Sequence, residues 1–398
     1  MASALALTNA RLLDGRGAPP RDEVTVVVAE GRIARLGAEP PPPGAEVLDL
    51  EGRTLMPGLI DAHVHLTSLD LPHLPSELMP YGLVDAARRM IDAGITTLRD
   101  LGSRGRSLFE LRRAIELGLC VGPRLVVCGQ IVAATSPGGR AFPGMYREAD
   151  GPDEMRKAVR EQIRQGADFV KVMSTGALTV ADEDIGPAQV TRDELAAVVD
   201  ESHRMGFSVA SHAEGLDGIR LSVEAGVDTL EHGEMGFEAP EVLAAMAERG
   251  IVLVPTLRVF DAVVESDAFP QWMRERAKGL GESGRKTVAA AHRAGVAMAM
   301  GADAGPHGEN ARELLLMAEA GLSASEAIVA ATSTAARASG VDSEVGAIEG
   351  GKAADLLVLD GDPLEDLRLL LDPDRIWLVL RDGEPVAGTR VTRRLEEG

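Results

Sequence analysis

The run Pro57-Gly58-Leu59-Ile60-Asp61-Ala62-His63-Val64-His65 is a short apolar segment that ends in two histidines separated by one residue. Its length and its branched aliphatic residues predict a buried β-strand. Side chains two residues apart on a strand point to the same side, so His63 and His65 face one point. Without a metal, these imidazoles would leave ring nitrogens needing partners in a poorly hydrated place. The spacing therefore indicates a metal site. On this segment alone, a core histidine beside a chance neighbour is the plainer alternative.

Further short apolar runs follow, and each is separated from the next by a segment long enough for a helix. Four of them carry a polar residue able to bind a metal: Phe169–Met173, Ser208–His212, Thr229–Gly233 and Ala297–Asp303. Three others complete a set of eight strands: Ile95–Asp100, Arg124–Gly129 and Ile251–Thr256. Polar side chains at the carboxyl ends of strands in an alternating strand–helix series are typical of the active face of a (β/α)8 barrel. The sequence predicts an α/β fold with a distorted TIM barrel.

The two ends of the chain have a different character, with short β-like runs separated by turn signals. Neither end is large enough to bury a good core alone, and each would expose unpaired strand edges. We therefore expect residues 1–56 and 345–398 to pair into one composite β-sandwich domain, beside a catalytic barrel formed by residues 57–344.

The composition excludes several classes of protein. The formal net charge of −21 disfavours nucleic acid and anionic membrane surfaces as partners. No run approaches the roughly 18 apolar residues that a membrane span needs, and the first residues lack the features of a secretory signal. The two cysteines, Cys120 and Cys128, do not form a disulfide pattern. We expect a cytoplasmic protein that acts on a small-molecule substrate.

Seven stretches together resemble the metal-dependent amidohydrolase superfamily. The resemblance is closest to its branch of dipeptidases and carboxypeptidases, which includes Xaa-Pro and Xaa-Arg dipeptidases and borders on imidazolonepropionase. The stretches are PGLIDAHVH, GITTLRD, GADFVKVMSTG, ASHAEG, AGVDTLEHG, GADAG and VGAIEGGKAADLLVLDGDPL. They span nearly the whole chain, and it is their combination that is specific. The resemblance also implies a homo-oligomer.

A binuclear metal centre is what this resemblance implies for the polar strand ends. One divalent ion would be held by His63, His65 and Asp303, and a second by His212 and His232. Zinc suits imidazole and carboxylate ligands and is the first choice, while manganese, cobalt and iron stay open.

Lys171 stands in the middle of the run Phe169–Met173. It alternates with apolar neighbours, so it points into the barrel, where an unpaired ammonium is costly. Burial would lower its pKa and make the neutral amine available. The resemblance implies that this amine adds carbon dioxide and becomes an N6-carboxylated lysine that bridges the two ions.

The resemblance implies a hydrolase that cleaves an amide bond, the peptide-like C–N bond of a small substrate such as a dipeptide or an N-acyl amino acid. Hydroxide held between the two metals would attack the carbonyl. Asp303 would be the catalytic residue, which takes the proton of the attacking water and passes it to the leaving amine. Asp61 is placed to support a histidine ligand or to cap a helix.

Substrate contacts are less well defined by the sequence. Relatives that cleave dipeptides often have tyrosine or histidine where this chain has Glu214, which could instead attract an amino group. Four other residues in loops after strands could bind a carboxylate or a carbonyl, and a structural role is an equal alternative for each: Arg140, Tyr146, Arg258 and His307.

Two other functions compete with this interpretation. A mononuclear, imidazolonepropionase-like hydrolase of cyclic amides, or a deaminase, shares the histidines and Asp303. Such enzymes usually place a glutamate three residues after the histidine that corresponds to His212, where this chain has Gly215. That reading also leaves Lys171 unexplained. A metal-free barrel used as a scaffold is the second alternative, but every ligand is present.

Overall fold

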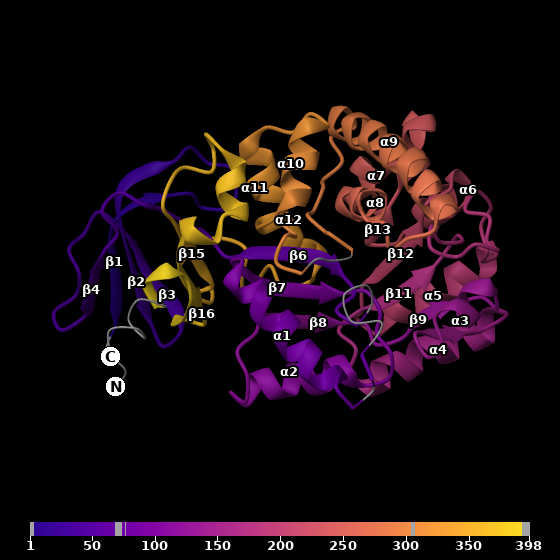
Figure 1. The fold of residues 1–398 in the computed structure, drawn as a ribbon, viewed down its shortest axis with the longest axis horizontal. Coiled ribbons are helices and arrows are strands. Elements are labelled where there is room, and N and C mark those ends of the chain that lie inside the picture. The colour runs from indigo at the N-terminus through magenta and orange to yellow at the C-terminus, as the bar shows by residue number, and fades with distance from the viewer. Residues whose placement is uncertain (1–3, 68–73, 76, 304–306, 392–398) are drawn as a thin grey trace.

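The computed structural model describes residues 4–67, 74–75, 77–303 and 307–391. In this part of the chain, a strand-rich unit lies beside a larger ring of strands surrounded by helices (Figure 1). The α-helices are α1 (Met79–Asp92), α2 (Ser107–Glu116), α3 (Pro137–Ala141), α4 (Pro152–Gln165), α5 (Arg192–Arg204), α6 (Leu216–Ala225), α7 (Pro240–Arg249), α8 (Leu257–Glu265), α9 (Gln271–Ala294), α10 (Arg312–Glu319), α11 (Ala324–Ala330) and α12 (Ser333–Ala338). Three short 3-10 helices are η1 (Glu234–Glu238), η2 (Leu367–Leu371) and η3 (Pro373–Arg375).

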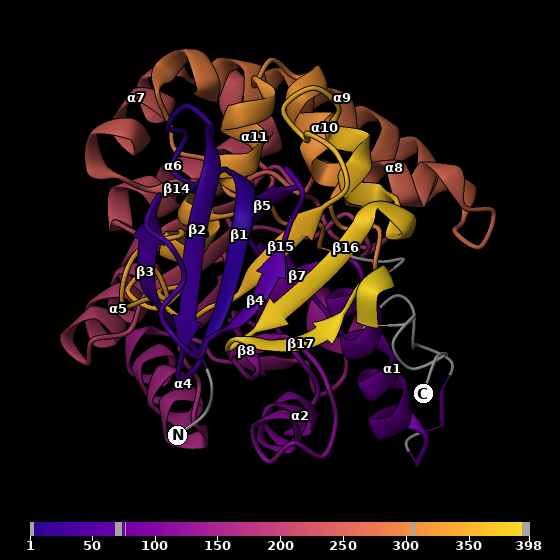
Figure 2. The same cartoon turned by 90° about the vertical axis from the view of Figure 1, so that its left-hand side faces the viewer.

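The strand-rich unit is one hydrogen-bonded sheet that draws on both ends of the chain (Figure 2). Its strands are β1 (Leu5–Leu12), β2 (Arg21–Ala29), β3 (Arg32–Gly37), β4 (Glu46–Asp49), β5 (Thr54–Pro57), β15 (Leu356–Leu359), β16 (Ile376–Arg381) and β17 (Glu384–Ala387). The sheet forks at β1, which pairs with β2 along one side and with β4 and then β5 along the other. Strand β5 pairs with β15, so the two chain ends share a sheet and a common apolar core. The proposed domain limits at residues 57 and 344 remain a prediction.

The ring of strands is a TIM barrel. Its strands are β6 (Leu59–Val64), β7 (Ile95–Asp100), β8 (Arg124–Val127), β9 (Ile131–Ala133), β11 (Val170–Met173), β12 (Val209–Ala213), β13 (Thr229–His232) and β14 (Val252–Val254), and the short strand β10 (Tyr146–Glu148) pairs with β9 alone. The pairs β6–β7, β7–β8, β11–β12, β12–β13 and β13–β14 are all parallel. Because parallel strands end at the same edge of a sheet, their carboxyl ends gather at one face of the barrel.

The third barrel strand differs from its prediction. The expected strand Arg124–Gly129 ends at Val127, and a second piece, β9, continues beyond Gly129. Gly129 has a φ of 77°, a left-handed backbone conformation that breaks the regular strand. Strand β8 pairs with β7 and β9 pairs with β11, so the two pieces together fill one position in the ring.

The eighth strand, expected over Ala297–Asp303, is an extended segment rather than a regular strand. It touches both neighbours through isolated bridges, Met298 with β14 and Asp303 with β6. The backbone N–H of Asp303 donates to the carbonyl of His63 at 2.7 Å, which closes the ring. Asp303 has a φ of 63°, so the chain turns there and the ladder cannot continue. The predicted position of this segment was correct, but the prediction of a regular strand there was wrong.

The helices cover the outside of the barrel through apolar faces. Helix α4, for example, buries Met155, Ala158 and Val159, which recur at helical spacing. The apolar side chains between the helices and the strands form the largest buried cluster in the described chain. Among the described residues, every helix is too short or too polar to cross a lipid bilayer.

Candidate metal centre and active-site cavity

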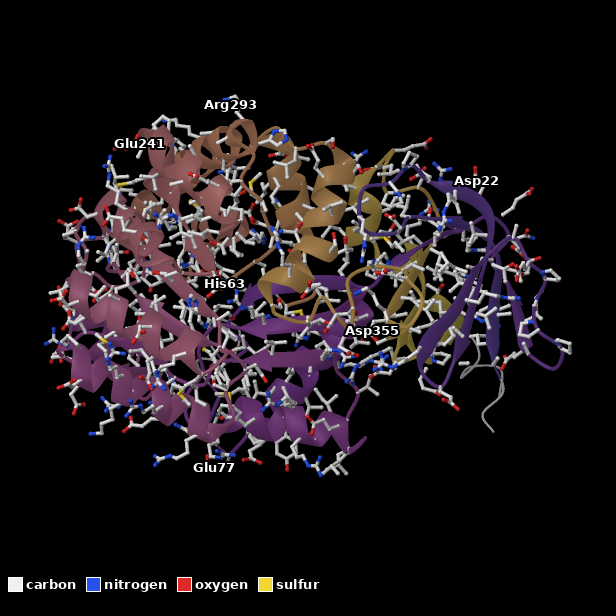
Figure 3. All side chains as sticks on the ribbon, turned by 180° about the vertical axis from the view of Figure 1, so that it is seen from behind. Asp22, His63, Glu77, Glu241, Arg293 and Asp355 are labelled. Atoms are coloured by element: carbon white, nitrogen blue, oxygen red, sulfur yellow. The ribbon has the colours of Figure 1, made fainter. Side chains whose placement is uncertain are left out.

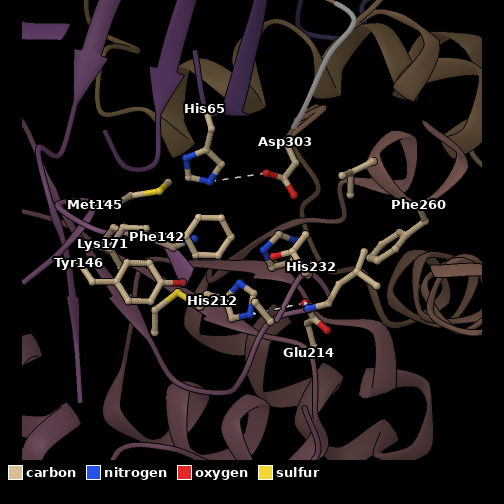
Figure 4. Close-up of a pocket in the computed structure, with 16 residues that line it drawn as sticks. His65, Phe142, Met145, Tyr146, Lys171, His212, Glu214, His232, Phe260 and Asp303 are labelled. Carbon is tan, nitrogen blue, oxygen red and sulfur yellow. Dashed lines mark hydrogen bonds and ion pairs between the residues drawn. The ribbon is translucent and has the colours of Figure 1, made fainter. Parts of the chain in front are cut away.

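A cavity at the carboxyl ends of the barrel strands collects most of the candidate ligands (Figure 4). It is lined by five of the six: His65, Lys171, His212, His232 and Asp303. The sixth, His63, is fully buried and lies in the interior of the molecule (Figure 3). The rings of His63 and His232 are 5.0 Å apart between centroids, and those of His212 and His232 are 4.5 Å apart. The structure thus brings the predicted ligands together from strands far apart in the sequence.

His63, His65 and Asp303 form the tightest group. Oδ1 of Asp303 lies 3.5 Å from Nε2 of His63 and 3.6 Å from Nε2 of His65. One ligand atom from each residue lies within 4.8 Å of the others. Nε2 of His63 is buried without a hydrogen-bond partner in the described part of the chain. A buried nitrogen of this kind is costly unless a ligand satisfies it, and a divalent ion between these three atoms would do so.

Each of the four imidazoles has one ring nitrogen close to a protein oxygen. Nδ1 of His63 lies 2.7 Å from Oε2 of Glu231, and Nδ1 of His232 lies 2.7 Å from Oγ1 of Thr256. The carbonyl oxygen of Gly102 lies 3.0 Å from Nδ1 of His65, and that of Gly176 lies 3.1 Å from Nε2 of His212. Such contacts fix the ring orientation and leave the opposite nitrogen as the metal ligand. The partners Glu231 and Thr256 were not predicted as site residues.

The backbone at two strand ends explains how neighbouring side chains reach the same site. Glu231 and His232 are consecutive in β13, so strand alternation alone would point them to opposite sides. His232 has a φ of 69°, which turns its side chain toward His63 while Glu231 also contacts His63. Thr256, which supports His232, has a φ of 49°. Left-handed conformations at non-glycine residues are strained and gather at functional sites.

Below the candidate ligands lies a buried charged network. Glu231 accepts hydrogen bonds from the Thr229 hydroxyl and, at 3.4 Å, from the guanidinium of Arg99, and all three side chains are inaccessible to solvent. The Arg99 guanidinium also stacks on the ring of Phe169, 4.2 Å from its centroid. One signal in the sequence could have revealed this network: Arg99 is a charged residue at an internal position of a buried strand.

Electrostatics favour the protonation states that a metal centre needs. Burial lowers the pKa of His65 to about 4 and of His212 to about 3, so both are neutral near pH 7. The same cause lowers the pKa of His63 and His232 well below the usual range. Burial also lowers the pKa of Lys171 to about 8, which makes its neutral amine accessible. Neutral imidazoles and a neutral amine fit a divalent metal centre with a carboxylated lysine.

Asp61 supports the site through the backbone. Its Oδ1 accepts a hydrogen bond from the backbone N–H of His63 at 3.0 Å, and its Oδ2 accepts one from the Asn310 amide at 2.7 Å. Asp61 thus contacts His63 through the backbone, whereas the contact with the ring of His63 is made by Glu231.

Two of the five predicted substrate contacts line the cavity, Tyr146 and Glu214. Oε1 of Glu214 accepts a hydrogen bond from the backbone N–H of Leu178 at 2.8 Å and lies 3.6 Å from Nε2 of His212. Burial and neighbouring carboxyl groups raise the pKa of Glu214 above its usual range.

The other three predicted substrate contacts are not among the described residues that line the cavity. The Arg140 side chain is 80% exposed and lies 4.0 Å from Asp182. Arg258 is buried, but its guanidinium pairs with Glu265 at 3.1 Å. The side chain of His307 is buried and does not line the cavity. The prediction that these residues lie in loops was wrong for Arg140 and Arg258, which lie in helices α3 and α8, and for Tyr146, which lies in β10.

Comparison with known proteins places this geometry in context. The profile of the amidohydrolase family matches residues 54–386. The chain is 31% identical to an ochratoxinase of Aspergillus niger over 95% of this chain and 85% of the relative. It is 29% identical to an imidazolonepropionase of Rhizorhabdus wittichii over 91% of this chain and 95% of the relative. The chain also superposes on a crystal structure of a prolidase complexed with N-methylphosphonate-L-proline, with a TM-score of 0.89 and 30% sequence identity. The match covers 97% of this chain and 100% of that chain.

The contact between His232 and Thr256 yields a prediction about metal affinity. Thr256→Val removes the hydroxyl but keeps the branched shape, so His232 loses the contact that orients its ring. We expect the affinity for zinc to fall about 10- to 100-fold, as loss of such a contact typically does. Competition with a chromogenic chelator measures this directly. Thr256→Ser, which keeps the hydroxyl, is the matched control and should bind zinc like the wild type. Unchanged zinc affinity in Thr256→Val would show that the contact does not support a metal ligand.

Proposed function

Because the chain belongs to the amidohydrolase family, and is therefore a hydrolase acting on C–N bonds, we propose that it is a binuclear metal-dependent enzyme. Its substrate is the amide bond of a small molecule such as a dipeptide or an N-acyl amino acid. The observation that carries this proposal is the convergence of His65, His212, His232, Lys171 and Asp303 at one cavity, with His63 buried beside them.

The proposed ligand assignment divides the site between two ions. His63, His65 and Asp303 hold one, and His212 and His232 hold the other, with zinc as the preferred metal. Lys171, on β11 between these groups along the ring, would be carboxylated on Nζ and would supply a carboxylate-like ligand between them. Its amine adds carbon dioxide with loss of one proton, which produces a carbamate that carries one negative charge.

When bound, the ions would polarise the substrate carbonyl and supply a water-derived nucleophile near neutral pH. The carboxylate of Asp303 takes the proton from the attacking water and delivers it to the nitrogen of the leaving amine. Its position 3.5 Å from His63 and 3.6 Å from His65 keeps it beside the proposed ligands throughout. Glu231 and Thr256 hold His63 and His232 in the orientation that this chemistry requires.

The apolar part of the cavity limits the kind of substrate. Its wall beside β9 and β10 is formed by Ile131, Phe142, Met145, Tyr146 and Met173. Such a wall suits an apolar group next to the amide rather than a strongly charged one. The prolidase complexed with N-methylphosphonate-L-proline, an amino acid derivative, is consistent with this substrate size.

The mononuclear alternative meets a steric obstacle. Its glutamate proton shuttle would stand at Gly215, where a Cβ atom would lie 2.2 Å from the carbonyl oxygen of Ile185 and 2.3 Å from that of Gly186. These neighbours are backbone atoms, so no side chain fits without moving the loop. Lys171 would also be buried without a function. The relation to imidazolonepropionase keeps cyclic amides in the test below.

A hydrolysis screen tests the proposed substrate class. The zinc-loaded protein is incubated with Xaa-Pro, Xaa-Arg and Xaa-Lys dipeptides, N-acyl amino acids, a lactam and a cyclic amidine, and released amines are quantified. We expect turnover of linear amides because the carbonyl group of an open-chain amide can approach the ions from the cavity. Asp303→Asn is the control and should lose about a thousandfold or more in kcat, the loss expected for a general acid–base group. Turnover confined to the cyclic compounds would favour the mononuclear alternative.

Replacement of Lys171 tests the carbamate. Lys171→Ala should lose most activity, and a short carboxylic acid such as acetate in the buffer should restore part of it, because the missing group is a small carboxylate. Lys171→Arg should stay inactive, since a guanidinium keeps its charge and cannot add carbon dioxide. Activity of all three proteins is measured with and without the acid. Full activity of Lys171→Arg would refute a bridging role.

A further inference from the structure

We propose that Glu313 is a positioning residue for the proposed metal site, although its side chain does not line the cavity. Its carboxyl group stabilises the start of helix α8 in place of the Thr256 hydroxyl, which leaves that hydroxyl to orient His232. The inference rests on the proposed function and adds to it a residue of α10 that acts on a candidate ligand through Thr256.

Thr256 directly precedes the first residue of α8. A threonine in this position usually accepts a hydrogen bond from an N–H of the first helical turn through its side chain. In the described part of the chain, Thr256 makes no such bond. Its Oγ1 lies instead 2.7 Å from Nδ1 of His232, and the residue is inaccessible to solvent. The hydroxyl that would cap α8 thus faces a candidate ligand.

Thr191 shows the usual arrangement at the start of another helix, α5. It has an extended backbone, with φ −76° and ψ 163°, and its Oγ1 accepts a hydrogen bond from the backbone N–H of Glu194 at 3.3 Å. Thr256 has φ 49° and ψ 41°, a left-handed conformation. Because a capping side chain typically reaches the first turn from an extended backbone, the conformation of Thr256 directs its hydroxyl elsewhere.

Glu313 supplies the acceptors that the start of α8 would otherwise lack. Its Oε1 accepts a hydrogen bond from the backbone N–H of Leu257 at 2.9 Å, and its Oε2 accepts one from that of Arg258 at 2.7 Å. Glu313 is inaccessible to solvent. Buried N–H groups at a helix start are costly without acceptors, so the cap that Thr256 does not make has been replaced from α10.

The position of Glu313 is tied to the part of the barrel that holds His63. Its backbone N–H donates to the carbonyl of Asn310 at 3.0 Å, and the Asn310 side chain donates to Oδ2 of Asp61 at 2.7 Å. Asp61 in turn accepts a hydrogen bond from the backbone N–H of His63. The first turn of α10 therefore connects the His63 side of the site to the start of α8.

Hydrogen exchange in the metal-free protein tests whether Glu313 has replaced the cap. Thr256→Val should leave the exchange rates of the first two amides of α8 unchanged, because Glu313 still accepts from both. Thr191→Val is the matched control and should speed exchange of the Glu194 amide about fivefold, as loss of an ordinary cap does. A similar acceleration at the start of α8 in Thr256→Val would overturn the proposal, and this comparison needs no variant of Glu313 to fold.

Zinc affinity tests whether Glu313 acts on His232 through Thr256. In Glu313→Gln an NH2 group replaces one acceptor, so the unsatisfied N–H of α8 competes for the Thr256 hydroxyl and His232 loses its contact. We expect the affinity for zinc, measured by competition with a chromogenic chelator, to fall about tenfold. The double variant Glu313→Gln/Thr256→Val should bind zinc no more weakly than Thr256→Val alone, because both changes remove the same contact. Unchanged affinity in Glu313→Gln, or losses that add in the double variant, would overturn the proposal.

Glu194→Gln is the matched control for a loss of stability alone. Glu194 also accepts hydrogen bonds from backbone N–H groups at helix starts, those of Gly151 at 2.7 Å and Thr191 at 2.8 Å, and it does not line the cavity. Its replacement should lower Tm, as Glu313→Gln does, but leave zinc affinity unchanged. If the wild-type protein binds zinc but hydrolyses no amide, the proposed function fails, while both comparisons still decide the role of Glu313.

Discussion

The contact between Nδ1 of His63 and Oε2 of Glu231, in a region closed to solvent, organises the site. A charged carboxylate in such a place must be paired, and Arg99 and Thr229 satisfy it from below. This leaves the outer nitrogen of His63 directed toward Asp303 and in need of a ligand. One requirement, that each buried polar group has a partner, thus links the barrel interior to His63 and His63 to the proposed metal position.

Much of the fold followed from local patterns. Alternating apolar runs located the barrel strands, and the spacing of His63 and His65 predicted two side chains facing one point. The pattern could not foresee the interruption at Gly129 or the irregular eighth segment ending at Asp303, because both depend on left-handed backbone conformations that only the closed ring imposes. His232 reached the site for the same reason, although simple alternation places it opposite Glu231.

The candidate ligands were easier to predict than the substrate contacts. All six candidate ligands came together, with strand alternation directing some of them and left-handed backbone conformations directing His232 and Asp303. Arg140 and Arg258 belong to helices α3 and α8, where strand alternation does not set the direction of a side chain. Two residues that follow His212 bear on the choice between the proposed functions, Glu214 and Gly215. One contributes a buried carboxyl group, and the other leaves space only for a loop backbone.

The proposed function depends above all on the metal content of the site, because the converging side chains are proposed to hold a pair of divalent ions. Elemental analysis of protein reconstituted with zinc and bicarbonate, combined with activity at each stage of loading, tests this claim most directly. We expect about two zinc ions per chain at full activity. Full activity with one ion per chain, and no gain when more is added, would contradict it.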